Sequence, residues 1–358
     1  MVDTSDTAIA ILGLGLITPG APSLAALSAA CASPGAAPKE TKSVPPPEGM
    51  SARDQRRLAR LTRLALLAAD NAAAQAGVRG RQAGIYIGLT HGTATFLKEF
   101  HDFLFDYGPE MASPNAFSNG VTNAPLGAIS LHQKLTEGGA TLVGIESCGL
   151  EVLCHAAAKV LDGTHELCYA GATEEYSPIV EDVYRRVGWY RGRLPDALPW
   201  PFAEGSGLGL GVSEGSVVCV VGRPSAVSAP RCLFTPVDDL DSLETPPDLV
   251  VCGAGGGPQD AHELKALQGL LPRFRRPVPL LFSKPFFGET FAVGSLLSLA
   301  MAWDVLVNRA RYPSYPAHES LRDRVAGAYD PGAVSTALVM AADREGSVAA
   351  GLLSRPNA

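Results

Sequence analysis

The sequence predicts an α/β fold, because short β-branched apolar runs alternate with longer segments whose apolar residues recur at helical spacing. The order strand, helix, strand, helix, strand, strand occurs in the first part of the chain and again in the last part. Such alternation is typical of sheets covered by helices. We therefore expect two halves of similar architecture, an N-terminal half over residues 1–223 and a C-terminal half over residues 224–358.

In the N-terminal half, the apolar pattern predicts the regular elements, and turn residues separate them. Pro34–Met50 is rich in proline, lysine and glutamate and predicts a surface loop. Tyr176–Trp200 is rich in aromatic residues, and we expect irregular structure there. We expect strands at Ala8–Leu14, Gln82–Leu89, Thr141–Ile145, Glu166–Ala170 and Ser216–Val221, and helices at Pro22–Ala32, Ser51–Gly77 and Leu150–Leu161.

The C-terminal half begins again with a buried strand that ends in glycines, as the N-terminal half does. We expect strands at Asp248–Gly253, Val278–Phe282, Val334–Ala341 and Val348–Leu353, and helices at Asp260–Leu271 and Phe291–Asn308.

Composition narrows the class of protein. Hydrophobic residues make up 46% and charged residues 18%, which suits a large buried core, and the net charge of −7 argues against a nucleic-acid or membrane-surface partner. No apolar run is long enough to span a bilayer, and the N-terminus has no basic region typical of a signal peptide. The seven cysteines form no C-x-x-C pair, which predicts free thiols without a metal site. We expect a cytoplasmic protein.

Residues 141–174 are the stretch most indicative of function, because a predicted strand, a tight turn and a buried helix follow one another. Many α/β enzymes place a nucleophile at such a turn, where the free N–H groups of the helix N-terminus favour negative charge. Two side chains at this turn could carry chemistry, Glu146 and Cys148.

This stretch resembles the nucleophile turn of the β-ketoacyl synthases, a family with the thiolase fold. The resemblance implies a five-layer α-β-α-β-α architecture built from two duplicated halves. The residues that match the family pattern without a gap are Thr141, Gly149, His155-Ala156-Ala157 and Ala170-Gly171.

In this register the family's catalytic cysteine position holds Glu146, and Cys148 lies two residues further on. The family's two catalytic histidine positions hold Gly253 and Glu289. Lys284 is kept from the second histidine motif. The family's glycine-rich gatekeeping loop is replaced by residues 330–333.

The two glutamates could lie close together, or they could be separated by solvent or by Lys284. Because a buried carboxylate is costly unless it is paired, a structural contact of Glu146 with Lys284 or with the backbone is the favoured interpretation. A carboxylate pair that performs acid–base chemistry is the alternative.

A second segment, residues 108–129, matches the family at Pro114, Phe117, Asn123 and Gly127. The resemblance implies that this segment lies at a dimer interface and lines an acyl tunnel, with Phe117, Asn123 and Gly149 as candidates. The alternative is that Phe117 is an ordinary core residue. An arginine-rich flank between Arg53 and Arg63 predicts a solvated helix face, with carrier-protein docking as the lesser interpretation.

The resemblance is greatest to chain-length factors, the non-condensing partners of ketosynthases in type II polyketide or aryl-polyene synthesis. It implies a heterodimer with an active ketosynthase and no cofactor or metal of its own, since acyl-phosphopantetheine arrives on an acyl carrier protein. The alternatives are a divergent acyltransferase or decarboxylase that acts on carrier-protein thioesters through Cys148 or Glu146, and a scaffold or regulatory homodimer.

Overall fold

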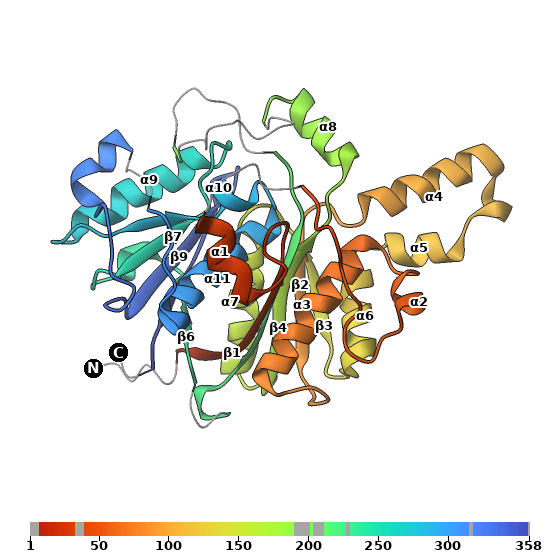
Figure 1. Cartoon of the computed structure of the whole chain (residues 1–358), viewed down its shortest axis with the longest axis horizontal. Helices are drawn as coiled ribbons and strands as arrows, with labels where there is room; N and C mark the ends of the chain where they lie inside the picture. The colour runs from red at the N-terminus through yellow and green to blue at the C-terminus, as the bar shows by residue number, and fades with distance from the viewer. Residues whose placement is uncertain are drawn as a thin grey trace.

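The computed structural model of the chain (Figure 1) describes residues 7–32, 39–189, 201–202, 211–226, 230–314 and 318–356. The strands of the first half are β1 (Ile9–Ile17), β2 (Gly84–Leu89), β3 (Gly139–Val143), β4 (Leu167–Glu174) and β5 (Gly215–Gly222). Those of the second half are β6 (Leu233–Pro236), β7 (Leu249–Cys252), β8 (Leu280–Phe282), β9 (Thr336–Ala342) and β10 (Val348–Ser354). The sequence analysis missed β6, which has only four residues.

The strands join into one sheet in which each half repeats the same order. Within the described residues the sheet runs β3-β2-β4-β5-β1-β6-β10-β9-β7-β8. In each half the first strand pairs antiparallel with the fifth, and the second lies parallel to the third and the fourth. β1 and β6 pair antiparallel where Ile9 faces Phe234, which joins the halves. The expected duplication is confirmed, and the exact boundary after residue 223 stays a prediction.

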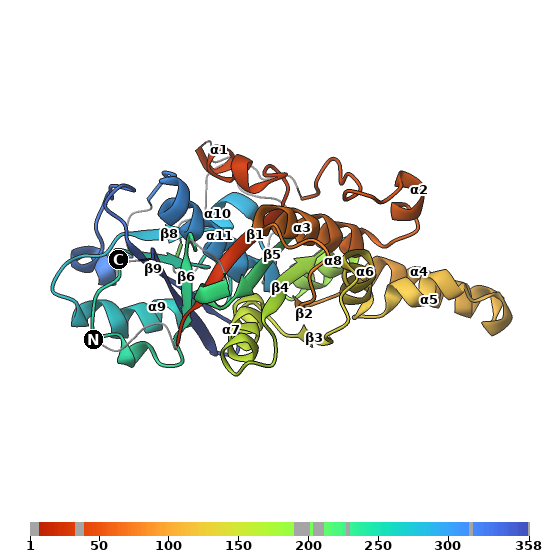
Figure 2. The ribbon, with the colours of Figure 1, turned by 90° about the horizontal axis from the view of Figure 1, so that it is seen from below.

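Two helices, α7 (Cys148–Leu161) and α11 (Ala292–Asn308), form the middle layer. They contact each other, and each contacts strands of both halves. On the outer faces, α3 (Arg60–Ala76) packs on β1 and β5, α6 (Ala124–Gln133) packs beside α3, and α9 (Asp260–Leu270) packs on β9 and β10. Figure 2 shows α3 and α7 on opposite sides of β1. The expected five-layer α-β-α-β-α fold is confirmed.

The remaining helices are α1 (Leu27–Ala32), α2 (Ala52–Gln55), α4 (Ala94–Tyr107), α5 (Pro114–Gly120), α8 (Pro178–Arg186) and α10 (Lys284–Phe287). Two of them extend away from the layered body, α4 and α5 (Figures 1 and 2). The prediction of irregular structure over Tyr176–Trp200 is wrong for α8, whose first turn begins at Pro178, a residue that suits a helix start. Residues 190–200 lie outside the described residues.

The single helix predicted over Ser51–Gly77 is also wrong, because the chain bends between α2 and α3. Asn119 is buried at this bend, where its side chain accepts the N–H of Ala59 at 2.9 Å and donates to the carbonyl of Arg57 at 3.2 Å. These bonds take backbone groups that a continuous helix would use internally. A contact distant in sequence therefore overrides the local helical pattern.

The close approach of the two middle helices depends on Gly149. A Cβ atom at this position would lie 2.2 Å from the carbonyl oxygen of Ala292, and the next residue donates its N–H to Ser295 Oγ at 3.0 Å.

We predict that Gly149→Ala lowers the free energy of unfolding by about 1–3 kcal/mol, because the helices must move apart. Urea denaturation followed by circular dichroism measures the change.

Gly127→Ala is the matched control, since this glycine lies inside α6 and a Cβ atom there meets nothing within 4 Å. Alanine is the better helix former, so this variant should keep or raise stability by about 0.5–1 kcal/mol. Equal destabilisation by both substitutions would contradict the proposed helix contact.

Candidate functional site

The turn that joins β3 to α7 buries a carboxylate at the point where the sequence analysis expected a nucleophile. Residues 144–147 form the turn, in which the N–H of Cys148 donates to the carbonyl of Ile145 at 3.1 Å. The side chain of Glu146 points into the interior and is only 2% exposed. The site therefore starts from a buried negative charge just before the N-terminus of a middle-layer helix, which favours such a charge.

Arg344 neutralises this carboxylate from the other half of the chain. It lies in the tight turn between β9 and β10, and its Nη2 contacts Glu146 Oε1. Glu146 Oε2 accepts the backbone N–H and the Nε–H of Arg344, both at 3.3 Å. A two-pronged arginine–carboxylate contact of this kind is strong and directional.

Two aromatic rings hold the Arg344 guanidinium in place. Its carbon lies 5.1 Å from the ring centre of Tyr184, which α8 provides, and 4.7 Å from the ring centre of Trp189. Arg344 also donates to the Tyr184 hydroxyl at 2.9 Å, and that hydroxyl lies 3.0 Å from Nε2 of His91. The α8 segment thus closes over the turn that carries Glu146.

The second ion pair joins Lys284 to Glu289. Lys284 Nζ lies 2.7 Å from Glu289 Oε2, and both side chains are buried. The other oxygen of Glu289 accepts the N–H of Phe291 at 2.7 Å, and Gln259 donates to Oε2 at 3.3 Å. Glu289 therefore accepts a backbone N–H at the start of α11. Glu146 lies at the corresponding place, just before the start of α7.

The charges around them favour the ionised forms of Glu146 and Lys284. Burial opposes ionisation of Glu146, yet the charges of Lys284 and Arg344 together hold the pKa of its carboxyl below the ordinary value. Burial likewise opposes the charge on Lys284, but Glu289 and Glu146 raise the pKa of its ammonium group. Ionised, paired groups of this kind supply neither a thiolate nor a neutral proton donor for acyl chemistry.

Gly253, which the sequence resemblance matches to the first family histidine, lies close to two charged side chains. A Cβ atom at Gly253 would lie 3.1 Å from Glu263 Oε1 and 3.9 Å from the Cε atom of Lys284. Glu263 accepts the N–H of Gly253 at 3.1 Å, and burial raises the pKa of this carboxyl to about 8. Lys284 and Glu263 therefore fill the space beside the glycine.

Cys148 is poorly suited to act as a nucleophile. Its sulfur packs against β2, where a Cβ atom at Gly88 would lie 3.1 Å away, and the thiol is 3.8 Å from the carbonyl of Leu142. Burial, with Glu151 and Glu174 nearby, raises the pKa of the thiol to about 12. Because the thiolate is the reactive form, almost none of this cysteine is reactive near neutral pH.

The other candidate residues do not bind the charged groups of this cluster. Phe117 is 59% exposed on α5, so the interpretation as an ordinary core residue is wrong. Asn123 is exposed at the start of α6, and Gly149 is buried between α7 and α11, so a tunnel role for these residues stays a prediction. Residues 330–333 contact Arg309 instead of the cluster, and the β9–β10 turn lies beside Glu146.

The sequence analysis missed Arg344, Tyr184 and Trp189. The favoured side-chain partner of Glu146 was Lys284, whereas the residue that contacts Glu146 directly is Arg344. The expected backbone contact of Glu146 is present, and its donor is the N–H of Arg344. The available signal was the Asp-Arg-Glu-Gly turn between two apolar strands of the C-terminal half. A charged turn is common on protein surfaces, so only the fold reveals that this arginine points inward.

We predict that Arg344→Met lowers the free energy of unfolding by about 3 kcal/mol or more at neutral pH, because it leaves Glu146 buried without its direct partner. The pKa of Glu146 is lowered in the folded state, so the stabilisation from the pair is present above the ordinary value of 4.5. It is lost as the pH falls through the lowered value. The measurement is urea denaturation of wild type and variant from neutral pH down to below pH 4.5.

Arg81→Met serves as the control, since Arg81 lies 3.9 Å from Glu166 in an exposed pair. Such pairs contribute about 0–1 kcal/mol. The double variant Glu146→Gln/Arg344→Met should regain part of the lost stability, because it removes the unpaired charge. If Arg344→Met lowers the free energy of unfolding no more than Arg81→Met does, the buried pair does not stabilise the turn.

Comparisons with known proteins agree with this architecture. Residues 32–226 match the β-ketoacyl synthase N-terminal domain. No curated protein sequence that was compared matches the chain. The solved structures that resemble it include the ishigamide ketosynthase/chain length factor, at a TM-score of 0.77 and 14% identity over 98% of this chain and 100% of that one.

Two further structures have the same fold. A β-ketoacyl synthase from Burkholderia phymatum STM815 aligns at a TM-score of 0.75 and 17% identity, covering 98% of this chain and 100% of that chain. The apo AntDE:AntF complex is a type II polyketide-synthase acyl-carrier protein with its ketosynthase. It aligns at a TM-score of 0.76 and 13% identity, covering 98% of this chain and 99% of that chain. Identities this low show the fold alone. The match over more than half of the sequence shows that the chain belongs to the β-ketoacyl synthase family.

Proposed function

We propose that the chain is a non-condensing subunit of the chain-length-factor type, which pairs with an active ketosynthase and shapes its acyl tunnel. The observation that carries this proposal is the presence of two buried ion pairs, Glu146–Arg344 and Lys284–Glu289, where the resemblance expects the catalytic cysteine and the second catalytic histidine. Ketosynthase chemistry needs a thiolate and donors for an enolate. In the register of the resemblance, the positions of the thiol and of the two imidazoles hold Glu146, Gly253 and Glu289, and none of these side chains supplies a thiolate or an imidazole donor.

An exposed apolar surface supports pairing with another subunit. Phe117 on α5, Leu131 on α6 and Val143 on β3 are 59%, 83% and 63% exposed. β3 is also the terminal strand of the sheet within the described residues, so one of its edges is open. Exposed apolar patches beside an open strand edge mark protein interfaces.

The similar structures support the kind of partners. One is described as a ketosynthase/chain length factor, and another contains an acyl-carrier protein with its ketosynthase. We infer that a ketosynthase covers the α5–α6–β3 surface and that a carrier protein delivers acyl-phosphopantetheine to the pair. A product of the type II polyketide or aryl-polyene class and a cytoplasmic location stay predictions. Among the described residues, no helix combines the length and apolar character needed to cross a bilayer.

The enzyme alternative has less support. Cys148 is buried with its pKa raised to about 12, and Glu146 is ionised and held by Arg344.

Co-expression of this chain with a tagged, intact ketosynthase from the same genome tests the pairing. Stoichiometric co-purification is the expected result. A stable monomer that ignores every such ketosynthase would contradict the proposal.

Phe117 allows a sharper prediction about the tunnel. Removing this ring in the co-expressed pair should let a longer acyl chain enter, since each buried methylene contributes about 0.8 kcal/mol. We predict that Phe117→Ala shifts the products toward longer chains at normal protein yield, because the exposed ring contributes little to the stability of the subunit. Mass spectrometry of the products measures the shift.

Cys148→Ala is the control, because its thiol lies away from α5 and is not ionised. It should leave both the product profile and the rate nearly unchanged. Unaltered products from Phe117→Ala would exclude the tunnel role of this residue. A loss of activity of more than about tenfold from Cys148→Ala would instead support the enzyme alternative.

A further inference from the structure

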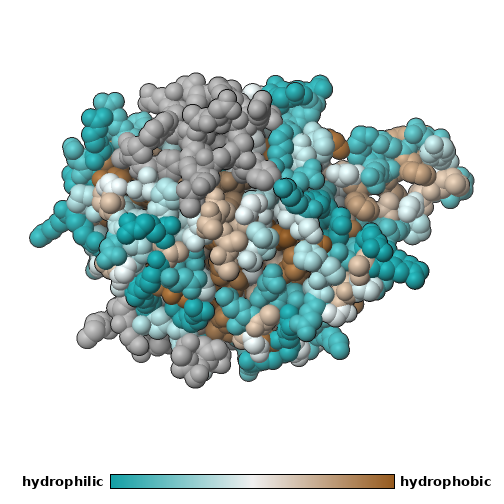
Figure 3. Space-filling model, viewed as in Figure 1, coloured by the Kyte–Doolittle hydropathy of each residue, from teal (hydrophilic) through white to brown (hydrophobic). Residues whose placement is uncertain are grey.

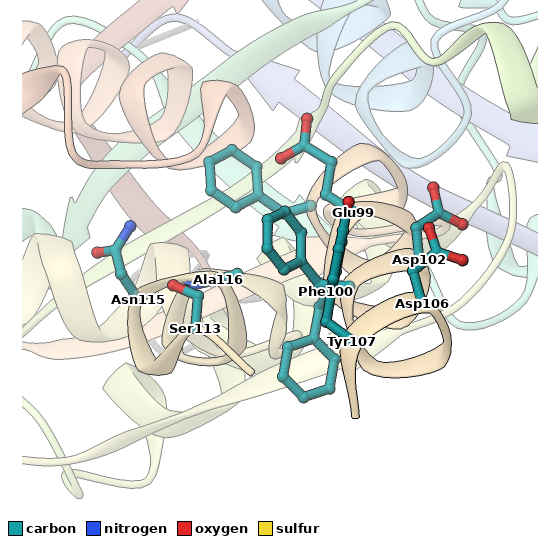
Figure 4. Close-up of a pocket in the computed structure, with 10 residues that line it drawn as sticks. Glu99, Phe100, Asp102, Asp106, Tyr107, Ser113, Asn115 and Ala116 are labelled. Atoms are coloured by element: carbon teal, nitrogen blue, oxygen red, sulfur yellow. The ribbon is translucent and has the colours of Figure 1, made fainter. Parts of the chain in front are cut away.

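The two helices that extend from the body, α4 and α5, present an open apolar groove. We call residues 94–120 the arm. No residue of α4 is buried, and the groove between α4 and α5 has a volume of about 540 Å³ (Figure 4). Short helices with so little packing are marginal in water. The arm therefore lacks the packing that a second apolar surface would supply.

Aromatic side chains form the floor of the groove. Phe96, Phe100, Phe103 and Tyr107 recur at helical spacing on one face of α4 and line the groove. Phe103 is 50% exposed and Tyr107 is 62% exposed. On the face seen in Figure 3, apolar and hydrophilic atoms lie side by side along the arm. An apolar stripe of this spacing accepts the stripe of another helix.

Acidic side chains form the rim. Glu99, Asp102 and Asp106 lie along the flank of α4 beside the aromatic stripe and also line the groove (Figure 4). Lys98 pairs with Asp102, whereas Glu99 and Asp106 have no ion-pair partner in the part of the chain that the structure describes. The rim therefore favours a positively charged occupant and disfavours carrier proteins and anionic membranes.

The base of the arm is fixed at both ends. The N–H of Thr95 at the start of α4 donates to Glu175 at 3.4 Å, and Asn119 at the end of α5 binds the backbone of Arg57 and Ala59. A groove held in one position loses little conformational freedom when it is occupied. The two ends of the arm are therefore anchored to the body, and the packing that is missing lies in the groove between them.

We propose that the groove receives a basic amphipathic helix of the partner subunit. This inference rests on the proposed pairing with a ketosynthase and adds the chemistry of the contact. The occupant carries large aliphatic residues at positions i, i+3 or i+4, and i+7, with lysine or arginine along its flank. The groove-lining part of α4 spans residues 96–107, or roughly 17 Å, which matches a helix of about eleven residues.

The test uses the full chain and two fluorescein-labelled synthetic helices. One peptide has leucines at the anchor positions and lysines on the flanks, and the other has glutamates in place of the lysines. Fluorescence anisotropy at low salt should show that the basic peptide binds about tenfold more tightly or better. Glu99→Lys/Asp106→Lys should reverse this preference.

Glu244→Lys/Glu319→Lys is the matched control, because it makes the same change in charge at two exposed acids outside the arm. It should leave the preference unchanged. Equal binding of both peptides, or reversal by the control pair, would overturn the proposal. A wild-type dimer in sedimentation that Glu99→Lys/Asp106→Lys dissociates would overturn it in favour of a second copy of this chain.

Co-purification separates this inference from the proposed function. With the ketosynthase co-expressed, the groove variant should reduce recovery of the pair at least severalfold, and the control pair should not. Full recovery with the groove variant would overturn the docking proposal while the pairing stands. Failure of the wild-type chain to co-purify would overturn the pairing itself, and with it the identity of the occupant.

Discussion

A carboxylate buried in a protein interior is tolerated only when cations and hydrogen-bond donors compensate it, and this constraint organises the centre of the molecule. Glu146 is compensated by Arg344 and by the charge of Lys284. Lys284 is in turn held by Glu289, which also accepts the backbone at the start of α11. Removing any one member leaves a buried charge unpaired, so the cluster is a single unit.

The duplicated fold explains why these residues meet. Glu146 lies just before α7 in the first half, and Glu289 lies just before α11 in the second. The N-termini of these two helices approach each other at Gly149, which brings both carboxylates to one place. In each half the helix N-terminus favours negative charge. A fixed carboxylate thus lies at the start of each of the two middle-layer helices.

Much of the fold could be predicted from sequence, since strands such as β2 and helices such as α11 are long, apolar and bounded by clear turns. The bend at Asn119 could not, because it depends on a contact distant in sequence. The helix α8 was missed although Pro178 is a local start signal. The family positions Glu146, Gly253 and Glu289 were found by resemblance, and the structure places them around Lys284. Arg344 was missed because a charged hairpin turn gives no signal that it points inward.

The central claim is that these ion pairs occupy the place of the groups that acyl transfer needs, so that this subunit carries no acyl chain. The most direct measurement is intact-protein mass spectrometry of the chain after incubation with an acyl-carrier-protein thioester, with an intact ketosynthase as the positive control. The account predicts that the ketosynthase gains the mass of the acyl group while this chain keeps its own mass. An acyl adduct that maps to Cys148 or Glu146 would contradict it.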